Sequence, residues 1–143
     1  MNKKFLAAAI LSFTMSSGVF AHGHCDETEL HGYMMNIKDE LKLMSGDVKS
    51  GDNESAAIRV QTLISYFEKS SEVTPNKFMS EHYEGEQLKM QTVAYEKSIK
   101  KMIDTLSRLK MALIEDNTEE VKKIFGEIGT QRNTGHQTFK SNC

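Results

Sequence analysis

Two side chains near opposite ends of the chain, Met34 and His136, have the chemistry to bind one metal ion together. Met34 lies in the segment L-H-G-Y-M-M-N-I and His136 in Q-R-N-T-G-H-Q-T-F. Each falls on the apolar stripe of a predicted helix, and an up-down-up-down bundle would bring both near the same end. A thioether sulfur and an imidazole nitrogen are an axial ligand pair for haem iron. Judged by residue type alone, Met34 can equally be a core-filling side chain and His136 a partly exposed polar residue near the end of a helix.

Two other side chains compete with Met34 for the sulfur-side position. His31 lies one helical turn earlier, and Met35 is the next residue in the sequence. Both are one residue off the apolar stripe that contains Met34, so the periodicity favours Met34.

The four predicted helices are long and separated by turn residues. They run roughly from Glu27 to Ser45, from Glu54 to Ser71, from Glu84 to Ile114, and from a cap at Thr118 to the end of the chain. We expect Ser45-Gly46-Asp47 to end the first helix and Pro75 to follow the second. The apolar stripes are Leu30, Met34, Ile37, Leu41 and Met44; Ala56, Val60, Leu63 and Phe67; Leu88, Thr92, Tyr95, Ile99, Met102, Leu106, Leu109 and Leu113; Val121, Phe125, Ile128, Arg132, His136 and Phe139. The pattern predicts an all-α, antiparallel up-down-up-down four-helix bundle.

The first 21 residues are typical of a signal peptide that is removed on export. Lys3 and Lys4 precede an apolar stretch, and Val19-Phe20-Ala21 offers the small residues that signal peptidase requires. Residues 22–143 then form a single four-helix-bundle domain in the periplasm, with no later stretch apolar enough to span a membrane.

The charge balance excludes nucleic acid as a partner. The whole chain has 18 basic and 20 acidic residues, and the leader contains two of the lysines, so residues 22–143 keep 16 against 20. A net charge of −4 lacks the clustered cations that phosphate recognition needs. It fits a soluble monomer that docks to a basic partner.

The segment Arg132-Asn133-Thr134-Gly135-His136-Gln137, together with residues 30–44, resembles the soluble cytochrome b562 family. Val73-Thr74-Pro75 is similar to the exit of that family's second helix, and Tyr95 to Leu106 is similar to its third. The resemblance covers nearly all of the chain after the leader. It implies an up-down-up-down bundle that holds one non-covalent b-type haem per chain.

The resemblance also implies roles for individual residues. Met34 and His136 would be the axial ligands, and Arg132 would steady a haem propionate or the ring edge. Filling both axial positions leaves no vacancy for substrate, so the expected function is periplasmic electron transfer to an unidentified redox partner, not an enzyme activity. The chain has no C-x-x-C-H, which excludes covalent c-type attachment.

The two cysteines, Cys25 and Cys143, flank the predicted bundle. An up-down-up-down topology places the start of the first helix beside the end of the last, and export leads to an oxidising compartment. We therefore expect a Cys25–Cys143 disulfide.

Cleavage after Ala21 would expose His22-Gly23-His24 as a new N-terminus. An amine, two backbone amides and an imidazole at the third position suit square-planar Cu(II). The alternative function is therefore a haem-free four-helix-bundle module for stress or copper handling.

Overall fold

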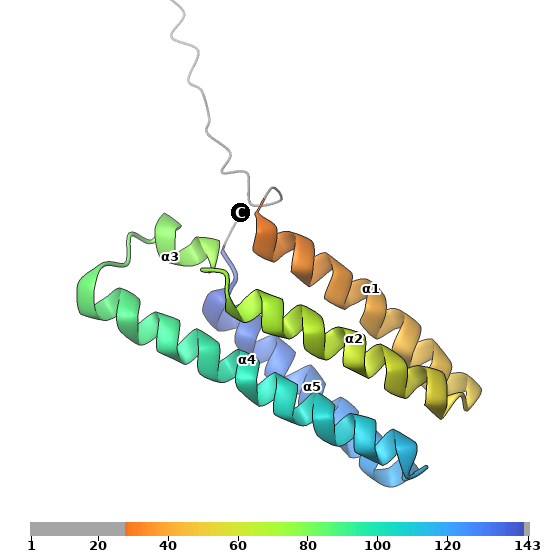
Figure 1. Cartoon of the computed structure of the whole chain (residues 1–143). Coiled ribbons are helices and arrows are strands. Elements are labelled where there is room, and N and C mark those ends of the chain that lie inside the picture. Colours follow the sequence, from red (N-terminus) through yellow and green to blue (C-terminus); the bar gives the residue numbers. More distant parts are fainter. Residues whose placement is uncertain (1–27, 142–143) are drawn as a thin grey trace, which may run out of the picture.

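Four long antiparallel helices and one short helix make up the fold (Figure 1). The structure is a computed structural model that describes residues 28–141. The elements are α1 (Glu29–Ser50), α2 (Asn53–Ser71), α3 (Asn76–Ser80), α4 (Gly85–Ile114) and α5 (Thr118–Phe139). Along the chain, α1 packs against α2, α2 against α4, and α4 against α5. The predicted all-α, up-down-up-down bundle is confirmed.

The first helix is longer than the sequence predicts. Ser45-Gly46-Asp47 does not form a turn, because α1 continues through these residues to Ser50. The helix ends at Gly51, whose φ of 80° is a left-handed conformation that glycine adopts without strain. Thr28 caps its start by accepting the backbone N–H of His31 at 3.1 Å.

The last helix begins one residue away from its expected cap. Asn117, not Thr118, is the N-cap residue, and its side-chain oxygen accepts the backbone N–H of Glu120 at 3.1 Å. Asn is among the best N-cap residues, since its short side chain reaches the free amides of the first turn.

The short helix α3 was not predicted. It follows Pro75, whose φ of −58° suits a helix start, and it buries the side chain of Phe78. The Phe78 ring packs edge-on against Tyr95 of α4 and Phe139 of α5, with centroid distances of 6.4 and 6.3 Å. The Lys77 ammonium donates to the Thr138 carbonyl at 2.8 Å. α3 therefore covers the end of the bundle where α5 terminates.

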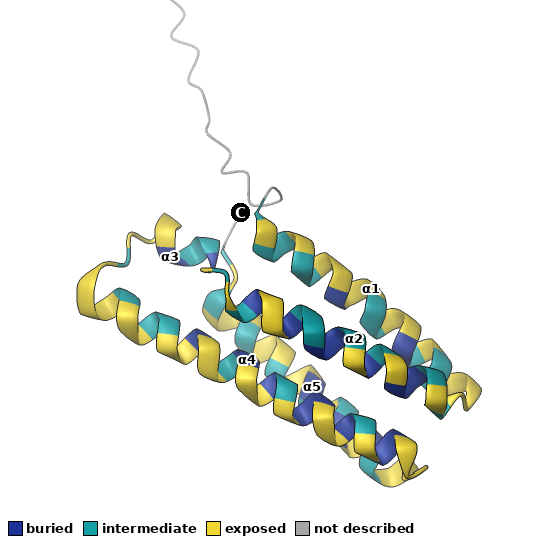
Figure 2. Ribbon diagram, in the orientation of Figure 1, coloured by how far each residue is buried: buried dark blue, intermediate teal, exposed yellow. Residues whose placement is uncertain are grey.

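Burial is uneven along the bundle (Figure 2). α2 contributes buried residues along its whole length, but α4 has none before Tyr95 and α5 has none after Ile128. The most fully buried side chains include Met44, Leu63, Leu106, Leu109 and Ile124. The core is therefore thinner at the end where α1 begins and α5 finishes. Within the described residues, no helix is long and apolar enough to cross a membrane.

Candidate functional site

Met34 projects from the flank of α1 that faces away from α2. The α2-facing flank is identified by Glu40 and Asp47, because both carboxylates bind the Arg59 guanidinium of α2. Met34 lies about 120° around the helix from these acids, given 3.6 residues per turn. Its side chain is partly buried and packs against the core. In a four-helix bundle the neighbour on this side of α1 is α5.

His136 projects from the corresponding flank of α5. Gln131 and Glu127 mark the side that faces α4, since they bind Thr105 and Arg108 of that helix. His136 lies on the other side of α5, roughly 140° from Gln131 by helical geometry. The side chains of Met34 and His136 are therefore directed to the same gap in the packing order, the one between the first and last helices.

α1 and α5 are the only neighbouring long helices of the described bundle that do not pack extensively on each other. Several apolar side chains that face this gap are left only partly buried, and we refer to them as the α1–α5 seam. They are Met34, Leu41, Phe125 and Phe139. Exposed apolar surface is unfavourable in water, so the seam would gain from an apolar partner.

The start of α1 and the end of α5 lie at the same end of the bundle (Figure 1). Met34 is five residues after the start of α1, and His136 is three residues before the end of α5. At a rise of 1.5 Å per residue, each lies within about 8 Å of its helix terminus along the axis. Because the helices are antiparallel, these termini are neighbours.

Burial separates Met34 from Met35 but not from His31, which is half-buried like Met34. The Met35 side chain is directed outward and is 40 % exposed. His31 lies on the Met34 flank but farther from the core, next to its Thr28 cap contact. Of the two methionines, Met34 is the one that packs against the core. Its role as a ligand stays a prediction.

His136 and Arg132 do not lie on the core stripe of α5, contrary to expectation. That stripe is formed by Val121, Ile124 and Ile128, whereas His136 and Arg132 are exposed. Helical periodicity explains the difference. With 3.6 residues per turn, the next apolar residue on the core side after Ile128 is Phe139, whereas Arg132 and His136 are rotated toward α1. The two residues are one helical turn apart on the same side of α5.

Electrostatics favour the ligating form of His136. Partial desolvation, together with the positive charges of Arg132 and Lys140, lowers the pKa of the imidazole below its usual value. The side chain is therefore neutral at pH 7, and only a neutral imidazole has a lone pair available for a metal.

An aromatic cluster of Phe78, Tyr83, Tyr95 and Phe139 supports this end of the bundle. Tyr95 and Phe139 are in edge-to-face contact, with centroids 5.3 Å apart. The Tyr95 hydroxyl donates to the Ser70 carbonyl at the end of α2, at 2.8 Å. Burial raises the pKa of Tyr95 to about 12. Sequence analysis placed Tyr95 on a core stripe but missed Phe78, whose only signal was an aromatic residue inside a polar connection.

The residues at the seam fit a b-type haem. They offer a thioether and a neutral imidazole, the axial pair found in electron-carrying haem proteins. They offer partly exposed apolar side chains that a flat porphyrin would cover, and a cation, Arg132, one turn from the imidazole. The donor set does not suit a hard divalent cation, since it contains no carboxylate.

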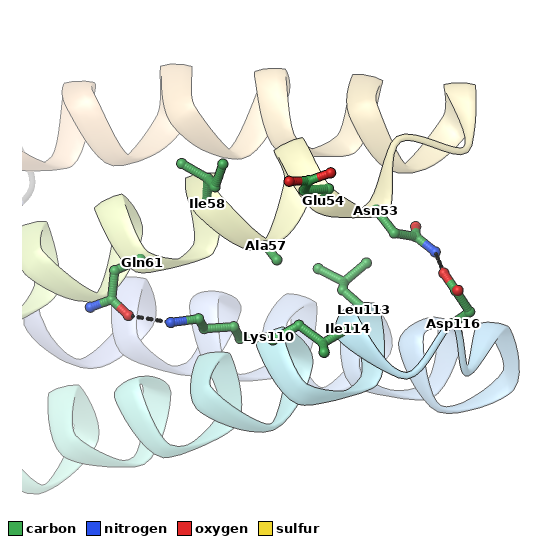
Figure 3. A pocket seen from close by; sticks show the side chains of 9 residues that line it. All are labelled: Asn53, Glu54, Ala57, Ile58, Gln61, Lys110, Leu113, Ile114 and Asp116. Atoms are coloured by element: carbon green, nitrogen blue, oxygen red, sulfur yellow. Dashed lines mark hydrogen bonds between the residues drawn. The ribbon is translucent and has the colours of Figure 1, made fainter.

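A second opening lies at the other end of the bundle, between α2 and α4 (Figure 3). This groove has a volume of about 590 Å³ and is lined by Ala57, Ile58, Leu113 and Ile114, among others. Its polar side chains bind one another: Lys110 donates to Gln61 at 2.9 Å, and Asn53 to Asp116 at 2.7 Å. The groove contains no sulfur or imidazole, so it is not a haem site.

Some predicted residues cannot be placed. Cys25, Cys143 and the His22-Gly23-His24 segment lie outside the described residues, so their disulfide and copper chemistry stay predictions. Within residues 28–141, no group of three His, Cys, Asp or Glu side chains is arranged to hold a metal ion.

Comparison with known proteins gives a family assignment. No curated protein and no solved structure matches the chain. The family model described as cytochrome b562 matches residues 29–140, which include all five helices up to the residue after α5. This match covers more than half of the chain and agrees with the observed bundle, and the chain therefore belongs to the cytochrome b562 family.

Proposed function

We propose that this protein is a periplasmic electron carrier that binds one non-covalent b-type haem between α1 and α5. What supports the proposal is the position of Met34 and His136, which helical periodicity directs to the gap between the first and last helices, at one end of the bundle. Family membership supports a haem-binding, electron-carrying role. The predicted leader supports the periplasm, and nothing in the proposal requires more than a monomer.

Each residue of the proposed site has a separate task. Met34 supplies a soft sulfur on one side, and His136 supplies a neutral nitrogen on the other. Arg132 is placed to attract a propionate carboxylate. Leu41, Phe125 and Phe139 would exclude water from the porphyrin faces.

A bound haem supplies an iron that takes up and releases one electron. If Met34 and His136 both hold the iron, dioxygen and substrates would find no open site on it, and the chain would favour electron transfer over catalysis. The thioether of Met34 and the apolar seam both disfavour the extra positive charge of the ferric state. We therefore expect a higher reduction potential than two imidazole ligands would give.

The test is a visible spectrum of the protein expressed with its leader, and of the purified protein after addition of hemin. A six-coordinate, low-spin haem spectrum in both oxidation states is expected at one haem per chain. A chain that purifies colourless and takes up no hemin would overturn the proposal.

Substitutions then assign the ligands. Met34→Ala should give a five-coordinate iron that binds carbon monoxide, whereas the matched control Met35→Ala should leave the spectrum unchanged. His136→Ala should weaken hemin binding at least about tenfold, since loss of even a ligand's supporting hydrogen bond typically has that effect. If His31→Ala, and not Met34→Ala, opens the coordination site, the sulfur assignment is wrong.

A further inference from the structure

Cations line one long side of this acidic molecule, although α2 and α4 also contain Lys and Arg residues. On the flank of α1 that faces away from α2, the charged side chains are Lys38, Lys42 and Lys49. Their separations of four and seven residues place them on one side of the helix. All three are exposed.

The adjoining flank of α5 has the same character. Lys122, Arg132 and Lys140 lie on the side that faces away from α4, next to His136, and all three are exposed. We call these six residues on the two helices the basic flank. Within the described helices no Asp or Glu lies between these cations, but Asp39 borders the flank one turn before Lys42 and Glu119 borders it one turn before Lys122. Glu40 and Asp47 face α2, and Glu120 and Glu127 face α4.

This distribution reverses the conclusion drawn from net charge. The whole chain has a formal charge of −2, so a flank of six cations leaves the rest of the molecule strongly acidic. An approaching partner responds to the local field within about one Debye length, which is about 8 Å at physiological ionic strength. A partner that reaches the α1–α5 seam therefore meets positive charge, although the protein as a whole is negative.

We infer that the basic flank is the docking surface for an acidic protein, the redox partner of the proposed electron carrier. This inference rests on the proposed function for the partner's redox role, but the surface itself is independent of haem. A haem's two carboxylates would neutralise only part of the six charges. Four of its members lie within about 12 Å of Met34 or His136 along the helix axes, at the edge of the proposed haem site where an electron would leave or enter. They are Lys38, Lys42, Arg132 and Lys140. Lys49 and Lys122 extend the flank toward the other end of the bundle.

The side chains of the flank favour a protein over a lipid surface. Membrane-surface helices combine cations with large apolar side chains that enter the bilayer boundary. Of the large apolar side chains that are clearly exposed, only Met35 lies at this flank, at 40 % exposure. A charged surface with few apolar contacts is typical of transient electron-transfer complexes, whose rates depend on electrostatic steering.

The haem-independent test uses poly-L-glutamate as the probe. Nuclear magnetic resonance spectra of the ¹⁵N-labelled protein, titrated with poly-L-glutamate at 10 mM salt, should show shifted amides along α1 and α5 around the basic flank. The shifts should disappear at 0.5 M salt. Shifts that map to α2 and α4 instead, or none at all, would overturn the docking surface and leave the haem proposal standing.

The second test measures electron transfer from the reduced holoprotein. One electron passes from ferrous haem to ferricyanide, a trianion, giving ferric haem and ferrocyanide. The second-order rate constant should fall as salt rises, whereas oxidation by the trication tris(phenanthroline)cobalt(III) should accelerate. The opposite salt dependence would mean that net charge, not the basic flank, controls approach.

Charge-reversal variants localise the effect. Lys38→Glu with Lys42→Glu should lower the ferricyanide rate constant at 10 mM salt at least about fivefold. Lys97→Glu with Lys100→Glu, an exposed pair on α4, changes net charge equally and should have less than about a twofold effect. Equal effects of the two pairs would refute the local surface. Binding to phosphatidylglycerol vesicles without a poly-L-glutamate response would assign the flank to membranes and overturn the proposal.

Discussion

Replacing Tyr95 with Phe isolates one buried hydroxyl at the end of the bundle that holds the candidate ligands. The side chain is 4 % exposed, and its hydroxyl donates to the Ser70 carbonyl at 2.8 Å. Phe keeps the ring contacts with Phe78 and Phe139. The Ser70 carbonyl also keeps a donor, because the Val73 backbone N–H lies 3.3 Å away. At pH 8 we therefore expect Tyr95→Phe to lower the free energy of unfolding by about 1 kcal/mol, the net value of one hydrogen bond.

The sign of this difference should change in alkali. Burial raises the pKa of Tyr95 from 10.0 to about 12 in the folded protein, so the unfolded chain loses the phenolic proton first. Stability due to this group is complete below pH 10 and is lost as pH rises toward 12. A shift of two units corresponds to about 2.7 kcal/mol in total, of which about 1.3 kcal/mol is lost by pH 11. The stabilities of the two proteins should therefore become equal near pH 11.

Urea unfolding followed by circular dichroism at pH 8.0, 9.5 and 11.0 measures the difference directly. Tyr33 and Tyr83 also have raised pKa values, because each is hydrogen-bonded to a glutamate, but they titrate in both proteins and cancel. A difference that stays near 1 kcal/mol up to pH 11 would refute the burial of the phenol. A difference of 3 kcal/mol at pH 8 would mean that the Ser70 carbonyl is left without a donor.

Two further predictions concern the backbone and the chain ends. Gly135→Ala should stabilise the apoprotein by about 0.5–1 kcal/mol, since the new Cβ would meet only the Ser98 hydroxyl at 3.9 Å. Gly51→Ala should destabilise it by about 1 kcal/mol, because the residue has a φ of 80°. Thermal unfolding measures both changes, and stabilisation by Gly51→Ala would contradict the left-handed turn at the end of α1. Cys25 and Cys143 should give no reaction with a thiol reagent in denaturant without reductant; two reactive thiols per chain would exclude the disulfide.

The bundle was predictable because it depends on local periodicity repeated over many residues. The four-residue stripe of α2 and most of the eight-residue stripe of α4 are buried as expected, since apolar positions repeated at 3.6-residue spacing form one face that is stable only when buried. The boundaries were less predictable. Ser45-Gly46-Asp47 has the composition of a turn, but α1 continues through it because Asp47 binds Arg59 on the neighbouring helix.

The site was only partly predictable for a related reason. Residue types predict Met34 and His136 as ligands, and this stays a prediction. The stripe of α5 does not extend from Ile128 to His136, and His136 lies on an exposed flank. A helical stripe reports burial against protein atoms, and a residue meant for a cofactor need not follow it. Phe78 was missed because five residues are too few to show a period.

The position of the seam has one more consequence. α1 and α5 are the first and last long helices of the described chain, so no loop connects one to the other. A planar cofactor that enters between α1 and α5 would therefore displace side chains only, and no loop would have to open. The apoprotein could then fold first and bind the cofactor afterwards. The predicted Cys25–Cys143 disulfide would limit how far α1 and α5 can separate during this step.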